Sequence, residues 1–297
     1  MKKGIISVLI AYAMWGFFPI YFKFLHAVPA TQIMAHRVSW SFVFLSLMII
    51  FTGKIKDLLK NMNKKVMLLY FCAGVIISIN WLTYVWGVNA GYVIETSLGY
   101  FINPLVSVLL GVIILKERLR PLQWVPVILA AIGVTYITIQ HGSLPWIAMV
   151  LAVTFGTYGL LKKIAPLQAT QGLTLETGGV FIPALGYLLF CEFTGTGAYG
   201  HINLPTTLLL TATGIITAVP LLFFAAGAPK VPLTTIGLLQ YIAPTIQFLI
   251  GVFIYREPFS TDQLIGFGII WLALIIFSLE SYSTNHKTMK LVHQEHT

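Results

Sequence analysis

The sequence predicts an all-α membrane protein of about ten transmembrane helices, arranged as two inverted five-helix repeats. Three observations predict this fold. The chain has 297 residues, of which 58% are hydrophobic and 9% charged, whereas soluble domains carry about 25% charged residues. So few charges cannot cover the surface of a soluble body of this size. Ten apolar segments are long enough to cross a bilayer, and the two halves of the chain share residues at a constant offset.

A transmembrane helix needs about 20 mostly apolar residues, because the hydrocarbon core of a bilayer is about 30 Å thick. Helices are expected because lipid offers no partners to backbone polar groups. The first segment follows Lys2 and Lys3 but exceeds the apolar core of about 7–15 residues of a secretory signal, so we interpret it as a retained helix. The ten predicted segments are 4–24, 32–51, 66–88, 92–115, 121–139, 145–162, 171–192, 206–227, 234–255 and 262–280.

Lysine and arginine residues gather in the loops on one side of the predicted bundle, the side that also holds the N-terminal lysines. The positive-inside rule places this side, and both termini, in the cytoplasm of a plasma (inner) membrane. Residues 282–297 are polar and predict a cytoplasmic tail. The net charge is +9, but the cations lie in short breaks between apolar segments and form no basic face. This distribution argues against a nucleic-acid partner and for the lipid bilayer.

An internal repeat supports the division of the chain into two similar halves. Residues 98–105 (LGYFINPL) resemble residues 238–245 (LLQYIAPT), and Glu117 and Glu257 are separated by the same 140 residues. The same offset relates further pairs: Gly16 and Gly156, Lys23 and Lys163, Gly74 and Gly214, Gly87 and Gly227, and Gln123 and Gln263. A single ungapped offset along the chain indicates duplication.

The predicted domains are a first repeat at 1–140 and a second at 141–281. Each repeat holds five helices. Because five is odd, the second copy must cross the membrane in the opposite sense to the first. Inverted repeats are typical of secondary transporters, whose substrate sites lie near the bilayer midplane between the repeats. Some channels share this plan, so duplication favours a transporter without excluding a channel.

Ionisable residues inside the apolar segments cost at least about 2.5–3.5 kcal/mol at a helix centre and need a structural or functional reason. Lys23, Arg37 and Glu95 lie toward the predicted outer side, and we expect Glu95 to pair with Arg37 or Lys23. Lys162 and Glu176 lie toward the inner side. The five residues are candidates for gating or coupling. Snorkelling at helix ends and structural ion pairs explain them equally well.

Polar and aromatic residues near two prolines mark a candidate binding site. Asn103 precedes Pro104, and Gln240 and Tyr241 precede Pro244, which predicts matching helix interruptions in the two repeats. Aromatic residues could bind a ring-bearing or cationic substrate, whereas close helix packing is the alternative. The predicted substrate-binding residues are Trp15, Asn80, Tyr84, Tyr100, Asn103, Tyr158, Gln240 and Tyr241.

The chain shows no phosphate-binding loop, no hydrolase motif and no metal-ligand spacing, and Cys72 and Cys191 lie in apolar segments. We therefore predict no cofactor, no metal and no catalytic residues. Energy would come from a proton gradient or from exchange, with Glu95 as the acidic candidate to carry a proton. An intramembrane enzyme acting on a lipid-linked substrate, a passive channel and a receptor stay as alternatives, and assembly as a homodimer stays open.

Several motifs taken together resemble the RarD proteins, which belong to the EamA group of the drug/metabolite transporter superfamily. The motifs are AHRVSWS (35–41), ETSLGYFINPL (95–105), ERLRPLQW (117–124), GLTLET (172–177) and LQYIAPT (239–245). The resemblance covers residues 4 to about 280. It implies a ten-helix inner-membrane permease with two inverted EamA repeats. Related members export amino acids or other metabolites, so the predicted function is export of a small metabolite or drug-like molecule by alternating access.

Overall fold

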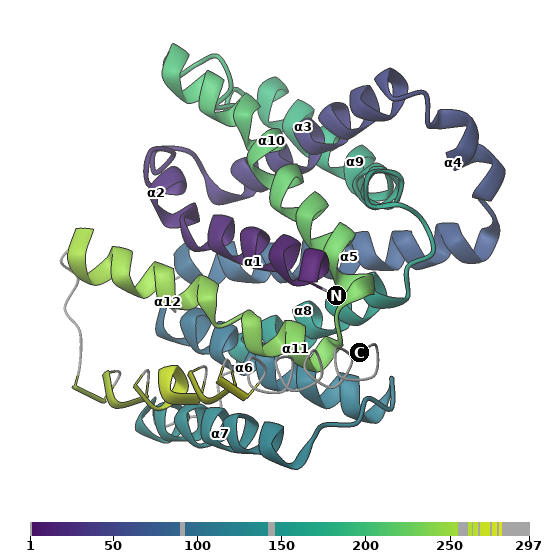
Figure 1. Ribbon diagram of the computed structural model, residues 1–297. Helices are drawn as coiled ribbons and strands as arrows, with labels where there is room; N and C mark the ends of the chain where they lie inside the picture. The colour runs from purple at the N-terminus through teal and green to yellow at the C-terminus, as the bar shows by residue number, and fades with distance from the viewer. Residues whose placement is uncertain are drawn as a thin grey trace.

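The computed structural model describes residues 2–89, 93–141 and 146–254, and the helical residues 261–262, 264–266, 268–273, 275–277 and 279–280. The described elements are helices joined by short loops (Figure 1). They are α1 (Lys2–Gly16), α2 (Phe18–Lys23), α3 (Ala30–Phe51), α4 (Ile55–Asn61), α5 (Lys64–Asn89), α6 (Val93–Ile113), α7 (Pro121–His141), α8 (Trp146–Ile164), α9 (Ala169–Phe193), α10 (Leu204–Gly227), η1 (Ala228–Lys230), α11 (Leu233–Leu239), α12 (Ile242–Leu249) and η2 (Ile250–Ile254).

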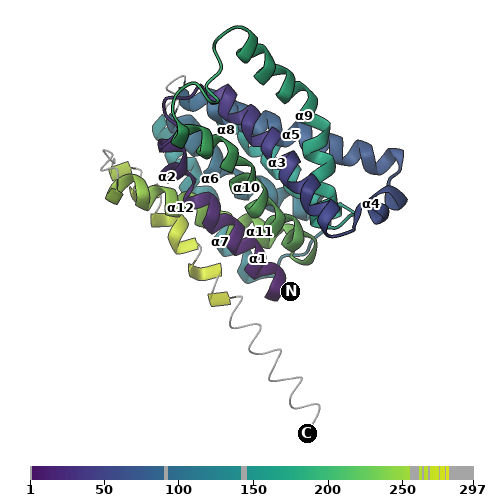
Figure 2. The same ribbon diagram turned by 90° about the horizontal axis from the view of Figure 1, so that it is seen from above.

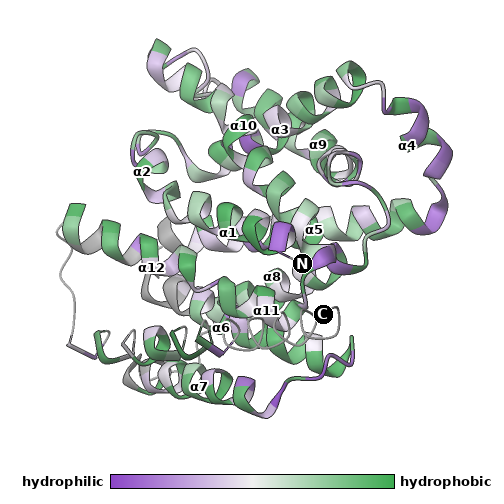
Figure 3. Ribbon diagram, in the orientation of Figure 1, coloured by the Kyte–Doolittle hydropathy of each residue, from purple (hydrophilic) through white to green (hydrophobic). Residues whose placement is uncertain are grey.

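The helices are those of a multi-pass membrane protein. Six helical segments are long and apolar enough to cross a membrane, and three shorter apolar helices accompany them, at Gly99–Ile113, Pro121–Tyr136 and Leu264–Phe277. The six long segments are Lys2–Lys23, Ala30–Phe51, Lys64–Gly87, Trp146–Ile164, Ala169–Phe193 and Leu204–Lys230. Hydrophobic residues cover most of these helices, and hydrophilic ones gather at α4 and near the N-terminus (Figure 3). The predicted all-α membrane fold is confirmed.

Two groups of helices face each other across α1 and α8 (Figure 1), and they overlap when the bundle is seen from above (Figure 2). The first group contains α3, α9 and α10, and the second contains α6, α7, α11 and α12. Helix α1 contacts α10 of the first group and α12 of the second, while α8 contacts α6 of the second group and also α5. Helices from the two halves of the sequence therefore interleave in one bundle.

Contacts between helices are exchanged by the 140-residue offset, which relates α1 to α8, α3 to α9 and α5 to α10. The contact of α1 with α10 has its counterpart in the contact of α8 with α5. Likewise, the contact of α3 with α10 has its counterpart in that of α9 with α5. This reciprocity is what two similar halves of opposite orientation would produce.

The same reciprocity holds for single residues. A Cβ atom added to Gly16 would lie 2.7 Å from Cβ of Ile246, and one added to Gly156 would lie 2.7 Å from Cγ1 of Val106. The offset that relates Gly16 to Gly156 also relates Val106 to Ile246. Glycine at these positions lets two helix backbones approach closely, as small residues do in membrane bundles. The domain boundaries at 140 and 281 stay predictions.

The two matching prolines have different local structures, which corrects the predicted pair of interruptions. Helix α11 ends and α12 begins at Gln240 and Tyr241, and Pro244 lies in the first turn of α12, where proline is tolerated. By contrast, α6 is continuous through Pro104. The hydroxyl of Tyr241 donates a hydrogen bond to the carbonyl of Phe101, at 3.1 Å. This bond ties Tyr241, the N-cap residue of α12, to α6 close to Pro104, although the carbonyl that lacks an N–H partner because of Pro104 is that of Tyr100.

Candidate functional site: a cavity and a closed end

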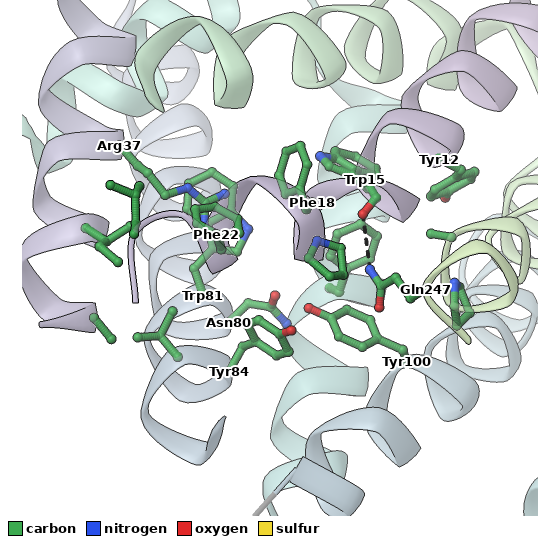
Figure 4. Close-up of a pocket in the computed structure, with 18 of the residues that line it drawn as sticks. Tyr12, Trp15, Phe18, Phe22, Arg37, Asn80, Trp81, Tyr84, Tyr100 and Gln247 are labelled. Atoms are coloured by element: carbon green, nitrogen blue, oxygen red, sulfur yellow. Dashed lines mark hydrogen bonds between the residues drawn. The ribbon is translucent and has the colours of Figure 1, made fainter. Parts of the chain in front are cut away.

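The lysine-rich end of the bundle, which holds Lys2, Lys54, Lys163 and Lys230, is here named the basic end; the other is named the opposite end. A cavity of about 270 Å³ lies between α1, α3, α5, α6 and α12. Its lining reaches the exposed His26 in the loop between α2 and α3, at the opposite end. Aromatic side chains supply much of the wall (Figure 4): Tyr12, Trp15, Phe18, Phe22, Trp81, Tyr84, Tyr100 and Phe155.

Five of the predicted substrate-binding residues line this cavity. They are Trp15, Asn80, Tyr84, Tyr100 and Gln240. They come from α1, α5, α6 and the break between α11 and α12, so both halves of the chain contribute. That these residues bind substrate stays a prediction.

The other three predicted residues, Asn103, Tyr158 and Tyr241, are buried outside the cavity wall. The hydroxyl of Tyr241 donates a hydrogen bond to the backbone of α6. The hydroxyl of Tyr158 donates one to Glu176, which pairs with Lys162. Asn103 is fully buried, and neither atom of its amide has a hydrogen-bond partner among the described residues. Its polar group therefore lies within the packed part of the bundle.

Amide side chains fix the cavity wall to the surrounding helices. Nδ2 of Asn80 donates to the carbonyl of Leu151 and to Oγ1 of Thr154, both at 2.9 Å. Nε2 of Gln247 donates to the carbonyl of Trp15 at 3.1 Å (Figure 4). These bonds tie α5 to α8 and α12 to α1. The polar surface of the cavity is thus held in place by contacts between the two halves.

Arg37 of α3 lines the cavity on the side of the opposite end. Its Nε donates to Oγ1 of Thr217 at 3.0 Å. The guanidinium carbon lies 4.4 Å from the ring centroid of Trp81 and 5.1 Å from that of Phe22. The side chain of Glu95 lies outside the described part of the chain, so its expected pairing with Arg37 or Lys23 stays a prediction.

An ion pair occupies the basic end of the bundle below the cavity. Nζ of Lys162 lies 2.6 Å from Oε1 of Glu176, and both side chains are 3% exposed. The hydroxyl of Tyr158 donates to Oε2 of the same carboxylate at 3.1 Å. The ammonium also lies 5.7 Å from the ring centroids of Tyr70 and Tyr158. Each charge is thus paired and surrounded by rings, as burial in a membrane bundle requires.

Further contacts close the same end. The carboxylate of Glu117 accepts hydrogen bonds from the backbone N–H groups of Leu233, at 2.7 Å, and Thr234, at 3.0 Å. Nζ of Lys163 donates to the carbonyl of Val231 at 2.5 Å. The start of α11 is therefore tied to the loop after α6 and to the end of α8.

The opposite end uses different chemistry at corresponding positions. The 140-residue offset relates Tyr158 to Phe18 and Lys162 to Phe22. At the basic end these positions surround the carboxylate of Glu176, whereas at the opposite end their counterparts lie beside the guanidinium of Arg37. Sequence reasoning missed Phe18, Phe22 and Gln247 as cavity residues. Applying the offset to Tyr158 and Lys162 would have found the first two.

Comparisons with known proteins agree with this architecture. Residues 2–139 match the EamA-like transporter family. The chain is 48% identical to the uncharacterized transporter YojE of Bacillus subtilis, covering 93% of this chain and 94% of that protein. It is 41% identical to the protein RarD of Escherichia coli, covering 97% and 98%. A crystal structure of a protein with 17% identity superposes with a TM-score of 0.70, covering 94% of this chain and 98% of that one.

The identities to full-length relatives extend over both halves of the chain and exceed what a shared fold alone would give. The crystal structure, at its lower identity, supports the fold alone. Several of these relatives are named as transporters. The chain belongs to the EamA-like transporter family and is a RarD-type permease of the drug/metabolite transporter superfamily.

Proposed function

We propose that the protein is a secondary transporter that exports a small metabolite or drug-like molecule across the plasma membrane by alternating access. The observation that carries this proposal is the asymmetry of the bundle. A cavity lined by both halves reaches one end, while the other end is closed by the Lys162–Glu176 pair. A binding site that is accessible from one side at a time is what alternating access requires.

The positive-inside rule supports the direction in which the cavity opens. Lys54, Lys163 and Lys230 lie at the basic end, which the rule assigns to the cytoplasm. With this orientation the cavity opens to the outside and the ion pair closes the cytoplasmic path. The structure is then the outward-facing state, in which an exporter releases its substrate and resets.

Cavity size supports a small substrate. Its volume of about 270 Å³ lies just below the range of about 300–1,000 Å³ that is usual for sites of drug-sized ligands. The aromatic wall offers large apolar contact area with a few polar groups to orient the ligand. A small metabolite with an apolar or ring-bearing part fits this description better than a strongly hydrated one.

The carboxylate of Glu176 supports coupling to protons. Protonation would remove the negative charge that holds Lys162 at the closed end, and a buried pair that loses one charge is strongly destabilised. Proton uptake from the cytoplasm could therefore accompany opening of the basic end. Glu95 stays a second candidate for this role, and exchange of one metabolite for another is the alternative source of energy.

Transport by the purified protein tests the proposal. A thermal-shift screen against amino acids, nucleosides, sugar phosphates and antibiotics identifies a ligand, because a ligand that binds the folded state raises the melting temperature. A carrier takes up that ligand into sealed proteoliposomes with saturation and shows counterflow. A flux that grows linearly with concentration and lacks counterflow would identify a channel, and conversion of the ligand would identify an enzyme.

A further inference from the structure

Arg37 is the one permanently charged residue among the described residues that line the cavity. Its side chain is 5% exposed and lies within a membrane-spanning helix. Burying an unpaired cation at membrane depth is costly. The guanidinium therefore calls for an anionic partner within reach of the cavity.

The environment of the guanidinium leaves part of its hydrogen-bonding capacity for a ligand. A guanidinium has five N–H donors in one plane. Among the described residues, Thr217 is its one hydrogen-bond acceptor, and that bond uses Nε. The ring centroids of Trp81 and Phe22 lie 4.4 Å and 5.1 Å from the guanidinium carbon. The terminal nitrogens donate in the plane, where a carboxylate can accept two parallel hydrogen bonds.

The rest of the cavity suits an uncharged, ring-bearing body attached to that anion. Tyr84 and Tyr100 pack with ring centroids 5.4 Å apart and lie on the same side of the cavity as Asn80 (Figure 4). Trp15 and Phe155 form another wall, with centroids 5.9 Å apart. These rings provide contact for an apolar group but no second charge. A cationic substrate would be repelled by Arg37, and a dianion would find one positive charge where it needs two.

We propose that Arg37 binds the carboxylate of the substrate, and that the protein carries monoanionic organic acids with an aromatic or apolar body. This inference rests on the proposed transport function and names its substrate class. It also gives the aromatic rings around Arg37 a role, because they hold the guanidinium in place beside the cavity. The rival explanation is that Arg37 serves Glu95 as a structural partner.

Matched ligands test the proposal with the purified full-length protein in detergent. The probes are benzoate, 3-phenylpropanoate and indole-3-acetate, each beside its neutral amide, and 3-phenylpropylamine as the cation. Binding is read from the melting temperature and from quenching of tryptophan fluorescence, to which Trp15 and Trp81 in the wall contribute. We expect at least one acid to bind at least tenfold more tightly than its amide and than the amine.

Substitutions assign the preference to its residue. Arg37→Gln should abolish the difference between acid and amide, whereas Arg37→Lys should retain part of it, since the charge stays and the two-bond geometry is lost. Arg120→Gln is the matched control, because Arg120 lies at the protein surface and pairs with Glu280 at 3.2 Å. The control should bind all probes as the unchanged protein does. Gel filtration verifies that each variant is folded. If Arg37→Gln does not fold, the acid preference of Arg37→Lys is compared with that of the unchanged protein instead.

Equal binding of acid, amide and amine, or no response to any of the three acids, would overturn the proposal. So would an acid preference that survives in Arg37→Gln. If Arg37 serves Glu95 as a structural partner only, Glu95→Gln and Arg37→Gln should lower the melting temperature alike and leave the acid preference unchanged, and that result would support the structural pairing instead. Uptake into proteoliposomes tests the transport function and the substrate class separately. Selective binding of the acid without uptake would refute transport alone. Uptake of the amide or amine in preference to the acid would refute the substrate class alone.

Discussion

The ammonium of Lys162 lies 2.6 Å from the carboxylate of Glu176 at a site where both side chains are buried. The two residues come from consecutive helices, α8 and α9, and Tyr158 adds a hydrogen bond to the same carboxylate. An ion pair with so little contact with solvent is held by its own geometry, because neither charge can recover its hydration. It is therefore suited to hold one conformation until a charge is removed.

Removing one charge of this pair should shift the conformational equilibrium toward opening at the basic end. Breaking a buried pair costs about 3–5 kcal/mol, and each 1.4 kcal/mol is a factor of ten, so the shift should exceed a hundredfold if the pair exists only in the closed form. Glu176→Gln and Lys162→Met are the variants. A membrane-impermeant thiol reagent can measure the shift at Trp15→Cys, in a background without Cys72 and Cys191.

We expect labelling of that cysteine from outside to fall, and labelling from the cytoplasmic side to rise, in both variants. Glu192→Gln is the control, because Glu192 pairs with His201 at an exposed site. If the accessibility of the cysteine is the same with and without the Lys162–Glu176 pair, the pair does not close the cytoplasmic path.

Glu117→Ala should destabilise the start of α11 by about 1–2 kcal/mol, the usual cost of losing a helix cap. Pro232 at the N-cap offers no side-chain hydrogen bond, so Glu117 alone among the described side chains caps these N–H groups. The stability of Glu117→Gln should lie between that of the unchanged protein and that of Glu117→Ala, since an amide retains one acceptor and loses the charge. The midpoint of thermal unfolding in detergent measures this order, and equal midpoints for all three proteins would contradict it.

Gly16→Ala and Gly156→Ala should each destabilise the bundle, because the added methyl group would lie 2.7 Å from a neighbouring side-chain atom. Overpacking of this kind costs about 1–3 kcal/mol. The control is Gly186→Ala in α9, where an added Cβ meets no atom within 4 Å and alanine favours the helix. The midpoint of thermal unfolding should fall for Gly16→Ala and Gly156→Ala and should not fall for Gly186→Ala.

Shortening the neighbouring side chain to alanine should rescue the Gly156→Ala variant but not the Gly16→Ala variant. At Gly156 the nearest atom is Cγ1 of Val106, with its Cβ at 3.3 Å, so Val106→Ala should restore much of the stability. At Gly16 the nearest atom is Cβ of Ile246 itself, so Ile246→Ala should not help. Rescue at both sites, or at neither, would show that the helices rearrange differently from the packing described.

The orientation of the chain can be tested by reporters. Green fluorescent protein fused after Ser281 should fluoresce, and alkaline phosphatase fused there should be inactive, because ten crossings return the chain to the cytoplasm. A phosphatase fused after His201, between α9 and α10, should be active. An active phosphatase after Ser281 would mean an odd number of crossings and would remove the basis for an inverted second repeat.

Composition and hydropathy determined the fold class by themselves. Lipid requires each spanning segment to satisfy its own backbone, so long apolar segments must become helices whatever surrounds them. The offset that relates Gly16 to Gly156 was visible in the sequence, and the contacts of these two glycines support it. Local sequence also indicated the charged residues that needed partners, among them Lys162 and Glu176.

Tertiary structure alone decided which residues face the cavity. Trp15 and Asn80 line it, whereas Tyr158 and Tyr241, of similar character, are buried in helix contacts. Likewise, the sequence could not show that α6 continues through Pro104, because the helices around a proline decide whether a membrane helix is interrupted there. The rotation and tilt of a membrane helix are set by packing against its neighbours rather than by its hydrophobicity. Apolar character is a property of one segment, but a cavity exists only between several of them.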